Sequence, residues 1–194
     1  MSEMPEFDRA SASVEARIKQ GHNLQDYFNS NTCWKITRFE NNKDLKQGIT
    51  YEPDQAKDCF DGIPQESLIQ GNVLLNEGIN ELLKLAATTG ATQWSNTNAY
   101  LGTGTSSIAE QATDTGLLGT PVYKGMDATW PQVTPQTCTW QSTFTSDDAN
   151  QAWNEFTVSN TATNAGINLN RKVSSQGTKQ VGQSWQLQLA ITFS

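Results

Sequence analysis

The clearest candidate for chemistry in this chain is Glu155, which lies two positions after Trp153. On an extended strand these two side chains share one face, and a carboxylate beside a large aromatic ring has the surroundings of an acid with a raised pKa. A glycosidase needs a second carboxylate opposite the first, and Asp127 is the only obvious one. The alternative is a structural ion pair of Glu155 with Arg171 or Lys172 on a neighbouring strand. We favour the pair Glu155–Arg171, and no catalytic residue is therefore expected.

The other motifs that resemble chemical sites are each incomplete. His22 is the single histidine, which excludes a catalytic triad and a multi-histidine metal site by counting. Residues 101–106 resemble a phosphate-binding loop but lack its Gly-Lys-Ser/Thr ending, so we interpret the glycines as points where a strand bends or approaches another chain closely. Asp147, Asp148 and Asn150 supply too few oxygens for calcium and are typical of a β-turn. No metal and no cofactor are expected.

Six tryptophans are many for a chain of 194 residues. Trp34, Trp140 and Trp185 lie on strand candidates, and we expect them in the core. Trp94 and Trp130 lie in loops, which makes them candidates for an exposed contact. Aromatic loop residues stack on sugars or anchor protein interfaces, and the sequence leaves both options open.

The elements that position these residues are mostly short strands. Over residues 184–193 apolar residues, beginning with Trp185 and ending with Phe193, alternate with neutral polar ones. This pattern places one face of a strand in a core and leaves the Gln and Thr face wet, either at the outside of a particle or at a subunit seam. The strand candidates are residues 99–104, 121–127, 136–145, 152–159, 166–173 and 184–193. Such spacing predicts a mainly β fold, an antiparallel, jelly-roll-like β-sandwich.

One amphipathic helix is predicted over residues 72–88. Asn72 is a good N-cap, and Gly90 is free to take the left-handed conformation that ends a helix. Gly78 inside the helix costs about 1 kcal/mol relative to Ala, which indicates close approach of another backbone. We expect the helix to pack across one end or one open face of the sheets.

The first 69 residues differ from residues 70–194, which we take as the sandwich domain. Residues 11–28 suggest a short helix, and residues 33–39 suggest an edge strand with Trp34 and Ile36 on one side. One interpretation of residues 1–69 is an irregular N-terminal arm that becomes ordered by packing on something else. The other is that this region contributes strands to the same sandwich.

The composition limits the partners and the compartment. The net charge is −7 and the longest basic run is Arg171-Lys172, so nucleic-acid binding is not expected. No stretch approaches the roughly 18 apolar residues of a membrane span, and the N-terminus lacks the pattern of a signal peptide. The three cysteines, Cys33, Cys59 and Cys138, have no metal-site spacing, and we expect reduced thiols in a protein made in the cytoplasm.

Several motifs in one order resemble a family of virion structural proteins from tailed bacteriophages. The motifs are Gly71-Asn72-Val73-Leu74-Leu75-Asn76-Glu77-Gly78-Ile79, Tyr100-Leu101-Gly102-Thr103-Gly104, Tyr123-Lys124-Gly125-Met126-Asp127, Ala152-Trp153-Asn154-Glu155-Phe156, Leu169-Asn170-Arg171-Lys172, Gly177-Thr178-Lys179 and Trp185-Gln186-Leu187. Such proteins are described as capsid decoration (cement) or tail-associated components. The resemblance covers about residues 70–194, and it implies neither an enzyme nor a cofactor.

The function expected from this resemblance is a decoration protein that binds and stabilises the assembled phage head. Its partner would be the major capsid protein, its location the virion after synthesis in the host cytoplasm, and its assembly a homotrimer. The expected anchors of the N-terminal arm are Phe7, Leu24, Tyr27 and Phe28. The alternatives are a tail or baseplate component and a carbohydrate-binding adhesin that uses Trp94 or Trp130.

Overall fold

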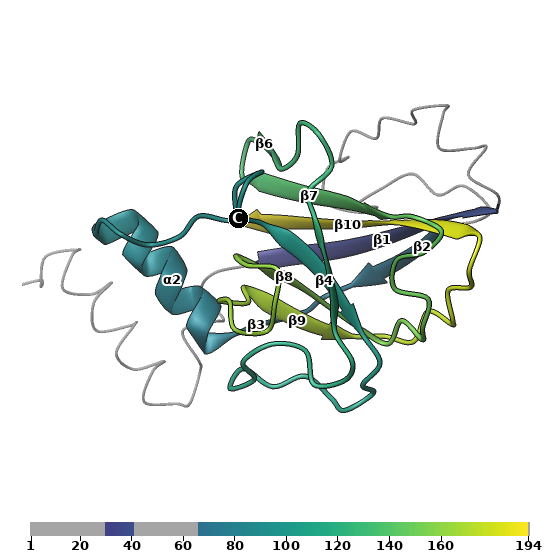
Figure 1. Cartoon of the computed structure of the whole chain (residues 1–194). Coiled ribbons are helices and arrows are strands. Elements are labelled where there is room, and N and C mark those ends of the chain that lie inside the picture. Colours follow the sequence, from purple (N-terminus) through teal and green to yellow (C-terminus); the bar gives the residue numbers. More distant parts are fainter. Residues whose placement is uncertain (1–29, 41–65, 194) are drawn as a thin grey trace, which may run out of the picture.

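The computed structural model describes residues 30–40 and 66–193, which form two antiparallel sheets of five strands each (Figure 1). The first sheet contains β1 (Ser30–Glu40), β2 (Glu66–Gln70), β6 (Gln132–Thr134), β7 (Thr137–Phe144) and β10 (Gln183–Phe193). The second contains β3 (Val73–Leu74), β4 (Tyr100–Gly104), β5 (Val122–Gly125), β8 (Glu155–Ser159) and β9 (Asn170–Val173). The strand orders are β2-β1-β10-β7-β6 and β3-β9-β8-β4-β5. The predicted mainly β antiparallel sandwich is confirmed.

The core between the two sheets is rich in aromatic rings. The Trp34 ring in β1 lies 5.8 Å from the Phe156 ring in β8, which joins the sheets directly. The Trp153 ring packs edge-on against Phe144 at 4.8 Å and against Trp185 at 4.9 Å. Edge-to-face contacts of this kind add to the free energy gained by burying the rings. The expectation that Trp34, Trp140 and Trp185 are core residues is confirmed.

The polar face of β10 is not wet over its whole length, contrary to the prediction. Ser184, Gln188 and Ala190 on that face are buried, and only Gln186 and Thr192 are partly exposed. The reason is the position of β10 inside the sheet, between β1 and β7. Gln188 lies in register with Lys35 on one side and with Gln141 on the other, and its Nε2 donates a hydrogen bond to Gln141 Oε1.

The strand predicted at residues 33–39 is an inner strand and not an edge strand. It corresponds to β1, which pairs with β10 on one side and with β2 on the other. Both β1 and β2 come from the first seventy residues, so the sandwich includes strands that begin well before residue 70. The alternative that this region contributes strands is therefore correct for residues 30–40 and 66–70. The proposed arm anchors Phe7, Leu24, Tyr27 and Phe28 lie outside the described residues.

The helix α2 (Asn76–Ala87) lies at one end of the sandwich (Figure 1). It begins four residues later than predicted, because residues 73–74 pair with β9 as strand β3. Leu75 therefore occupies the N-cap position, and Asn72 does not cap the helix. The close approach predicted at Gly78 is confirmed, since a Cβ atom there would lie 2.5 Å from the Leu169 Cα.

Candidate functional site

The centre of the candidate site is an ion pair between Glu155, the first residue of β8, and Arg171 of β9. One Arg171 guanidinium nitrogen lies 2.8 Å from Glu155 Oε2, and Arg171 Nε donates to the same oxygen at 2.9 Å. Both side chains are 0% exposed. A guanidinium presents its donors in a planar fork that suits carboxylates, so the geometry favours strong charge-assisted hydrogen bonds. The structure thus brings together the two residues that the sequence pairs.

Backbone N–H groups of a distant loop complete the surroundings of the Glu155 carboxylate. Ser106 donates at 3.2 Å, Leu118 at 3.0 Å and Gly119 at 2.6 Å. These donors all belong to residues 105–121, which we call the contact loop; it contains no helix or strand. Together with Arg171 they surround the carboxylate, so that its hydrogen bonds are all internal to the protein.

The position of the Glu155 carboxylate explains one glycine of the stretch at residues 101–106, namely Gly104. A Cβ atom on Gly104 would lie 2.5 Å from Glu155 Oε1. The absent side chain therefore leaves room for the carboxylate beside β4. The likeness to a phosphate-binding loop is physical in part, since backbone N–H groups do bind an anion here. The anion, however, is the protein's own carboxylate.

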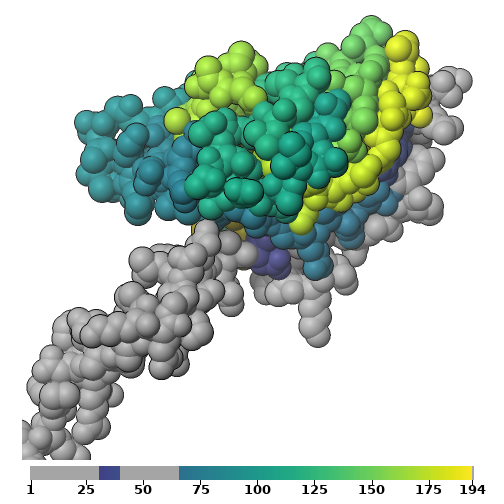
Figure 2. Space-filling model, turned by 90° about the horizontal axis from the view of Figure 1, so that it is seen from below, coloured from purple at the N-terminus to yellow at the C-terminus, as the bar shows by residue number. Residues whose placement is uncertain are grey.

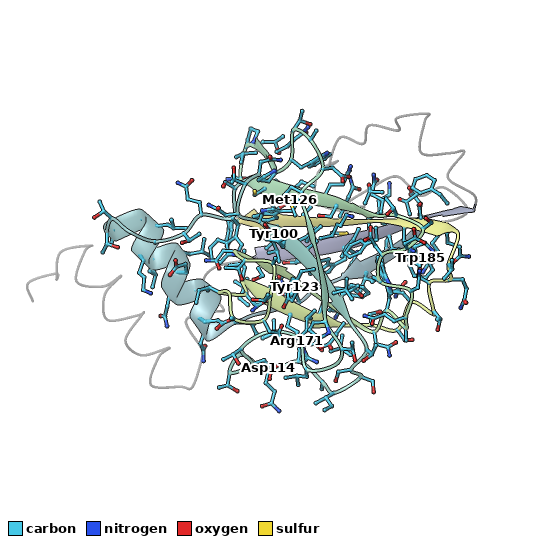
Figure 3. The ribbon with its side chains drawn as sticks, viewed as in Figure 1. Tyr100, Asp114, Tyr123, Met126, Arg171 and Trp185 are labelled. Carbon is cyan, nitrogen blue, oxygen red and sulfur yellow. The ribbon has the colours of Figure 1, made fainter. Side chains whose placement is uncertain are left out.

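The remaining donors of Arg171 also fasten the contact loop. One terminal nitrogen binds Asp114 Oδ2 at 2.9 Å, and the other donates to the Ile108 carbonyl oxygen at 3.0 Å. Figure 3 shows Arg171 and Asp114 side by side, on the far side of β9 from the first sheet. The neighbouring Lys172 lies 3.5 Å from Glu110, a second acid of the loop. The basic run Arg171-Lys172 is thus used to hold the contact loop against the second sheet.

The pair of carboxylates that a glycosidase would need is not assembled. Asp127 accepts hydrogen bonds from Gln141 Nε2 at 2.8 Å and from the Thr143 backbone at 2.9 Å, and so belongs to the β7 side of the molecule. The expected shared face of Trp153 and Glu155 is also wrong. Trp153 lies before the start of β8, and its backbone N–H donates to the Gly177 carbonyl oxygen. Its ring packs in the core near Phe156, whereas the Glu155 carboxylate lies against the contact loop.

The two loop tryptophans are buried, so the prediction of exposed aromatic contacts is wrong. Trp94 is 6% exposed and Trp130 is 9% exposed. The indole N–H of Trp94 donates to the Ile167 carbonyl, and the Trp94 carbonyl accepts from the Trp140 indole. The burial of both rings removes the stacking surface that the adhesin alternative assigns to Trp94 or Trp130.

The acidic turn at residues 145–150 binds a buried amine. Lys179 Nζ donates to the Thr145 carbonyl at 2.8 Å and to Asn150 Oδ1 at 2.7 Å. Burial lowers the pKa of Lys179, and the nearby acids Asp148 and Asp147 oppose this change. The lysine therefore supplies the positive charge in the turn that the sequence predicts at Asp147, Asp148 and Asn150.

Asp148 of this turn forms a second, more exposed pair. Its Oδ2 lies 2.6 Å from Lys124 Nζ and accepts hydrogen bonds from the Thr145 backbone and hydroxyl. Burial alone would raise the pKa of Asp148, but the hydrogen bonds from Lys124 and Thr145 outweigh it and lower the pKa. In this turn, neutral oxygen atoms of Thr145 and Asn150 bind the buried Lys179 amine. Asp148 forms an ion pair with Lys124 in a more exposed position.

A polar network that the sequence did not indicate lies behind the contact loop. The Tyr123 hydroxyl binds Asn164 and Asn168, and Asn164 also binds the backbone N–H and carbonyl of Leu117. Burial raises the pKa of Tyr123, and the charge of Glu155 raises it further. The network therefore holds the second half of the contact loop through neutral groups.

The described residues, 30–40 and 66–193, contain neither a candidate metal site nor a membrane-spanning helix. They contain no cluster of three or more His, Cys, Asp or Glu residues that could hold a metal ion. The same part of the chain includes no helix with the length and apolar character needed to cross a bilayer.

No family model, curated protein or solved structure matches this chain.

Proposed function

We propose that this chain is a structural protein of a tailed-bacteriophage virion, and that it is a capsid decoration protein that binds and stabilises the assembled head. The ordered motifs of residues 70–194 support the proposal. The observation that carries the proposal is the set of groups that the buried charged side chains bind. Glu155, Arg171 and Asp114 bind one another and backbone groups, so their chemistry serves to fix a loop and not to process a substrate.

The proposed mechanism is contact area without catalysis. The sandwich serves as a rigid body, and the arm of residues 1–29 becomes ordered on the major capsid protein, because ordering an extended segment buries a large surface. Phe7, Leu24, Tyr27 and Phe28 are the proposed anchors of this arm. The protein would be made in the host cytoplasm and act on the assembled shell as a homotrimer.

A variant that lacks residues 1–29 tests this proposal, since it keeps the whole of β1 from Ser30 onward. We expect its urea unfolding midpoint to equal that of the full chain, while its binding to undecorated capsids of the same phage is lost. The full-length variant Tyr27→Ser/Phe28→Ser should be weakened in the same assay, with Gln25→Ser as the matched control. Undiminished capsid binding by the folded truncated protein would overturn the proposal.

The number of copies per particle separates this proposal from a tail or baseplate role. A decoration protein covers the head and is present in many copies, whereas a tail component is present in few. Quantitative gel staining of purified particles against the major capsid protein measures this ratio. A low ratio would favour the tail.

A further inference from the structure

We infer that an exposed apolar end of the first sheet packs against the same capsid surface that the N-terminal arm binds. This end consists of Val133, Cys138 and Phe193, and we call it the end patch. The inference rests on the proposed function and adds a second contact to it, one made by the folded sandwich. Strand register places the three side chains together, and the point at which the arm joins β1 identifies the partner.

Strand pairing brings the side chains of the end patch onto one face of the sheet. Val133 of β6 lies opposite Cys138 of β7, and Cys138 lies opposite Ile191 of β10. Residues directly opposite each other on neighbouring strands share a face, with Cβ atoms about 5 Å apart. Phe193 follows Ile191 by two positions and so shares that face, and its backbone N–H donates to the Gln136 carbonyl at 2.9 Å.

The end patch is the place where the core of the sandwich reaches the surface. Ile191 is fully buried, and Cys138 is partly buried against the core. The outer positions are open, since Phe193 is 38% exposed and Val133 is 79% exposed. A preformed apolar surface of this kind binds a partner with little loss of conformational entropy.

The arm leaves the sandwich beside the end patch. Ser30, the first residue of β1, is the register partner of Phe193. A chain spans at most about 3.6 Å per residue, so the Cα atom of Phe28 lies within about 7 Å of the Ser30 Cα, and that of Tyr27 within about 11 Å. A capsid surface that binds these two proposed anchors is therefore within side-chain reach of Phe193.

The opposite end of β10 lacks this relation to the arm. Val181, just before β10, is 74% exposed, so apolar exposure alone does not distinguish it from Val133. However, the 11 residues of β10 separate Val181 from the end patch, and they span about 33 Å at about 3.3 Å per residue. The end of β10, marked C, lies on the side of α2 (Figure 1), and the yellow segment that leads into β10 lies at the end of the body away from α2 (Figure 2).

Binding of full-length variants to undecorated capsids of the same phage tests the inference. We expect Val133→Asp to weaken binding by at least about tenfold, because the new carboxylate would lose its water in an apolar contact. The matched control is Val181→Asp, which makes the same change at a similarly exposed valine and should bind like the wild type. Both variants should keep the urea unfolding midpoint of the wild type, since both side chains lie mostly in solvent.

The variant that lacks residues 1–29 is measured beside these two, so that the inference and the proposed function can fail separately. If the truncated protein loses binding while Val133→Asp binds like the wild type, the inference is overturned and the proposed function stands. Undiminished binding by the truncated protein would contradict the proposed function and, with it, the inference.

Photocrosslinking identifies directly what lies on the end patch. Benzoylphenylalanine at position 133 of the full-length protein should crosslink to the major capsid protein on decorated particles, whereas the same group at position 181 should not. A crosslink from position 133 to residues 1–29 of the same chain, or to a second copy, in place of the capsid protein would overturn the inference.

Discussion

The contact loop and the turn of residues 145–150 are each fastened to the sandwich by one buried basic side chain, but the two fastenings differ in kind. Arg171 in the loop site binds two carboxylates, those of Glu155 and Asp114. Lys179 in the turn site binds neutral oxygens of Thr145 and Asn150. A planar guanidinium can engage two acids and a carbonyl at once, whereas an ammonium is a compact charge on a flexible stem.

The contact loop and the turn also differ in the residues that they expose to solvent. The contact loop presents Ile108 and Leu118 to solvent, whereas the exposed residues of the turn, such as Thr145, Asp147 and Asn150, are all polar. A buried cation that fastens a segment therefore does not determine which residues that segment exposes.

The largest expected effect comes from removing the arginine of the loop site. Arg171→Met leaves Glu155 buried without its cation, and we expect a loss of about 3–5 kcal/mol in the free energy of unfolding. Urea unfolding followed by tryptophan fluorescence measures it. In the same variant, cleavage by Glu-C protease after Glu110 should become faster, because the contact loop is released.

Lys172→Met is the matched control on the same strand, since Lys172 is partly exposed and lies 3.5 Å from its acid. We expect it to lose less than about 1 kcal/mol. Equal losses for the two variants would contradict the idea that burial sets the two residues apart.

A smaller effect is expected from closing the space beside Glu155. Gly104→Ala places a methyl group 2.5 Å from Glu155 Oε1, which forces the carboxylate away from its donors. Overpacking of this kind costs about 1–3 kcal/mol in a urea titration. Gly125→Ala, on neighbouring strand β5, is the control, because its methyl group meets Tyr100 only at 3.6 Å. A neutral result for Gly104→Ala would mean that the carboxylate site is not rigid.

The sequence predicts those parts of the molecule that depend on local periodicity. The alternation of residues 184–193 places β10 in a sheet, and the expected position of Glu155 and Arg171 on neighbouring strands agrees with β8 and β9. Gly78 is a similar case, because a glycine inside an amphipathic helix has few explanations other than a close backbone.

The contact loop could not be predicted, since it binds Glu155 through backbone N–H groups that carry no sequence signal. Asp114 is 57 residues from Arg171, and no periodicity connects them. The burial of Trp94 and Trp130 was missed for a related reason. Position in a loop says little about exposure, because the three-dimensional packing of the loop decides which of its side chains are buried.

The turn site should respond less than the loop site to the loss of its cation. Lys179→Met leaves two neutral acceptors without a donor, and we expect a loss of about 1–3 kcal/mol in the free energy of unfolding, offset in part because no amine then has to be buried. Urea titration beside Arg171→Met gives the comparison directly, with Gln180→Met as an exposed control. A loss for Lys179→Met as large as that for Arg171→Met would remove the distinction between the two fastenings.

The smallest expected effect is a pH dependence of the free energy of unfolding, which arises from Asp148 in the turn of residues 145–150. The pKa of Asp148 is lowered in the folded protein, so the folded state holds fewer protons on this group than the unfolded state does. Its stabilising contribution is present above the ordinary pKa of 3.8 and is lost as the pH falls through the folded value. The wild type should therefore exceed Asp148→Asn in urea stability at neutral pH, and the difference should shrink in acid. Asp147→Asn, which changes the exposed neighbour, should show less of this trend. A difference that stays constant down to acid pH would mean that Asp148 acts in the turn through shape and hydrogen bonding and not through its charge.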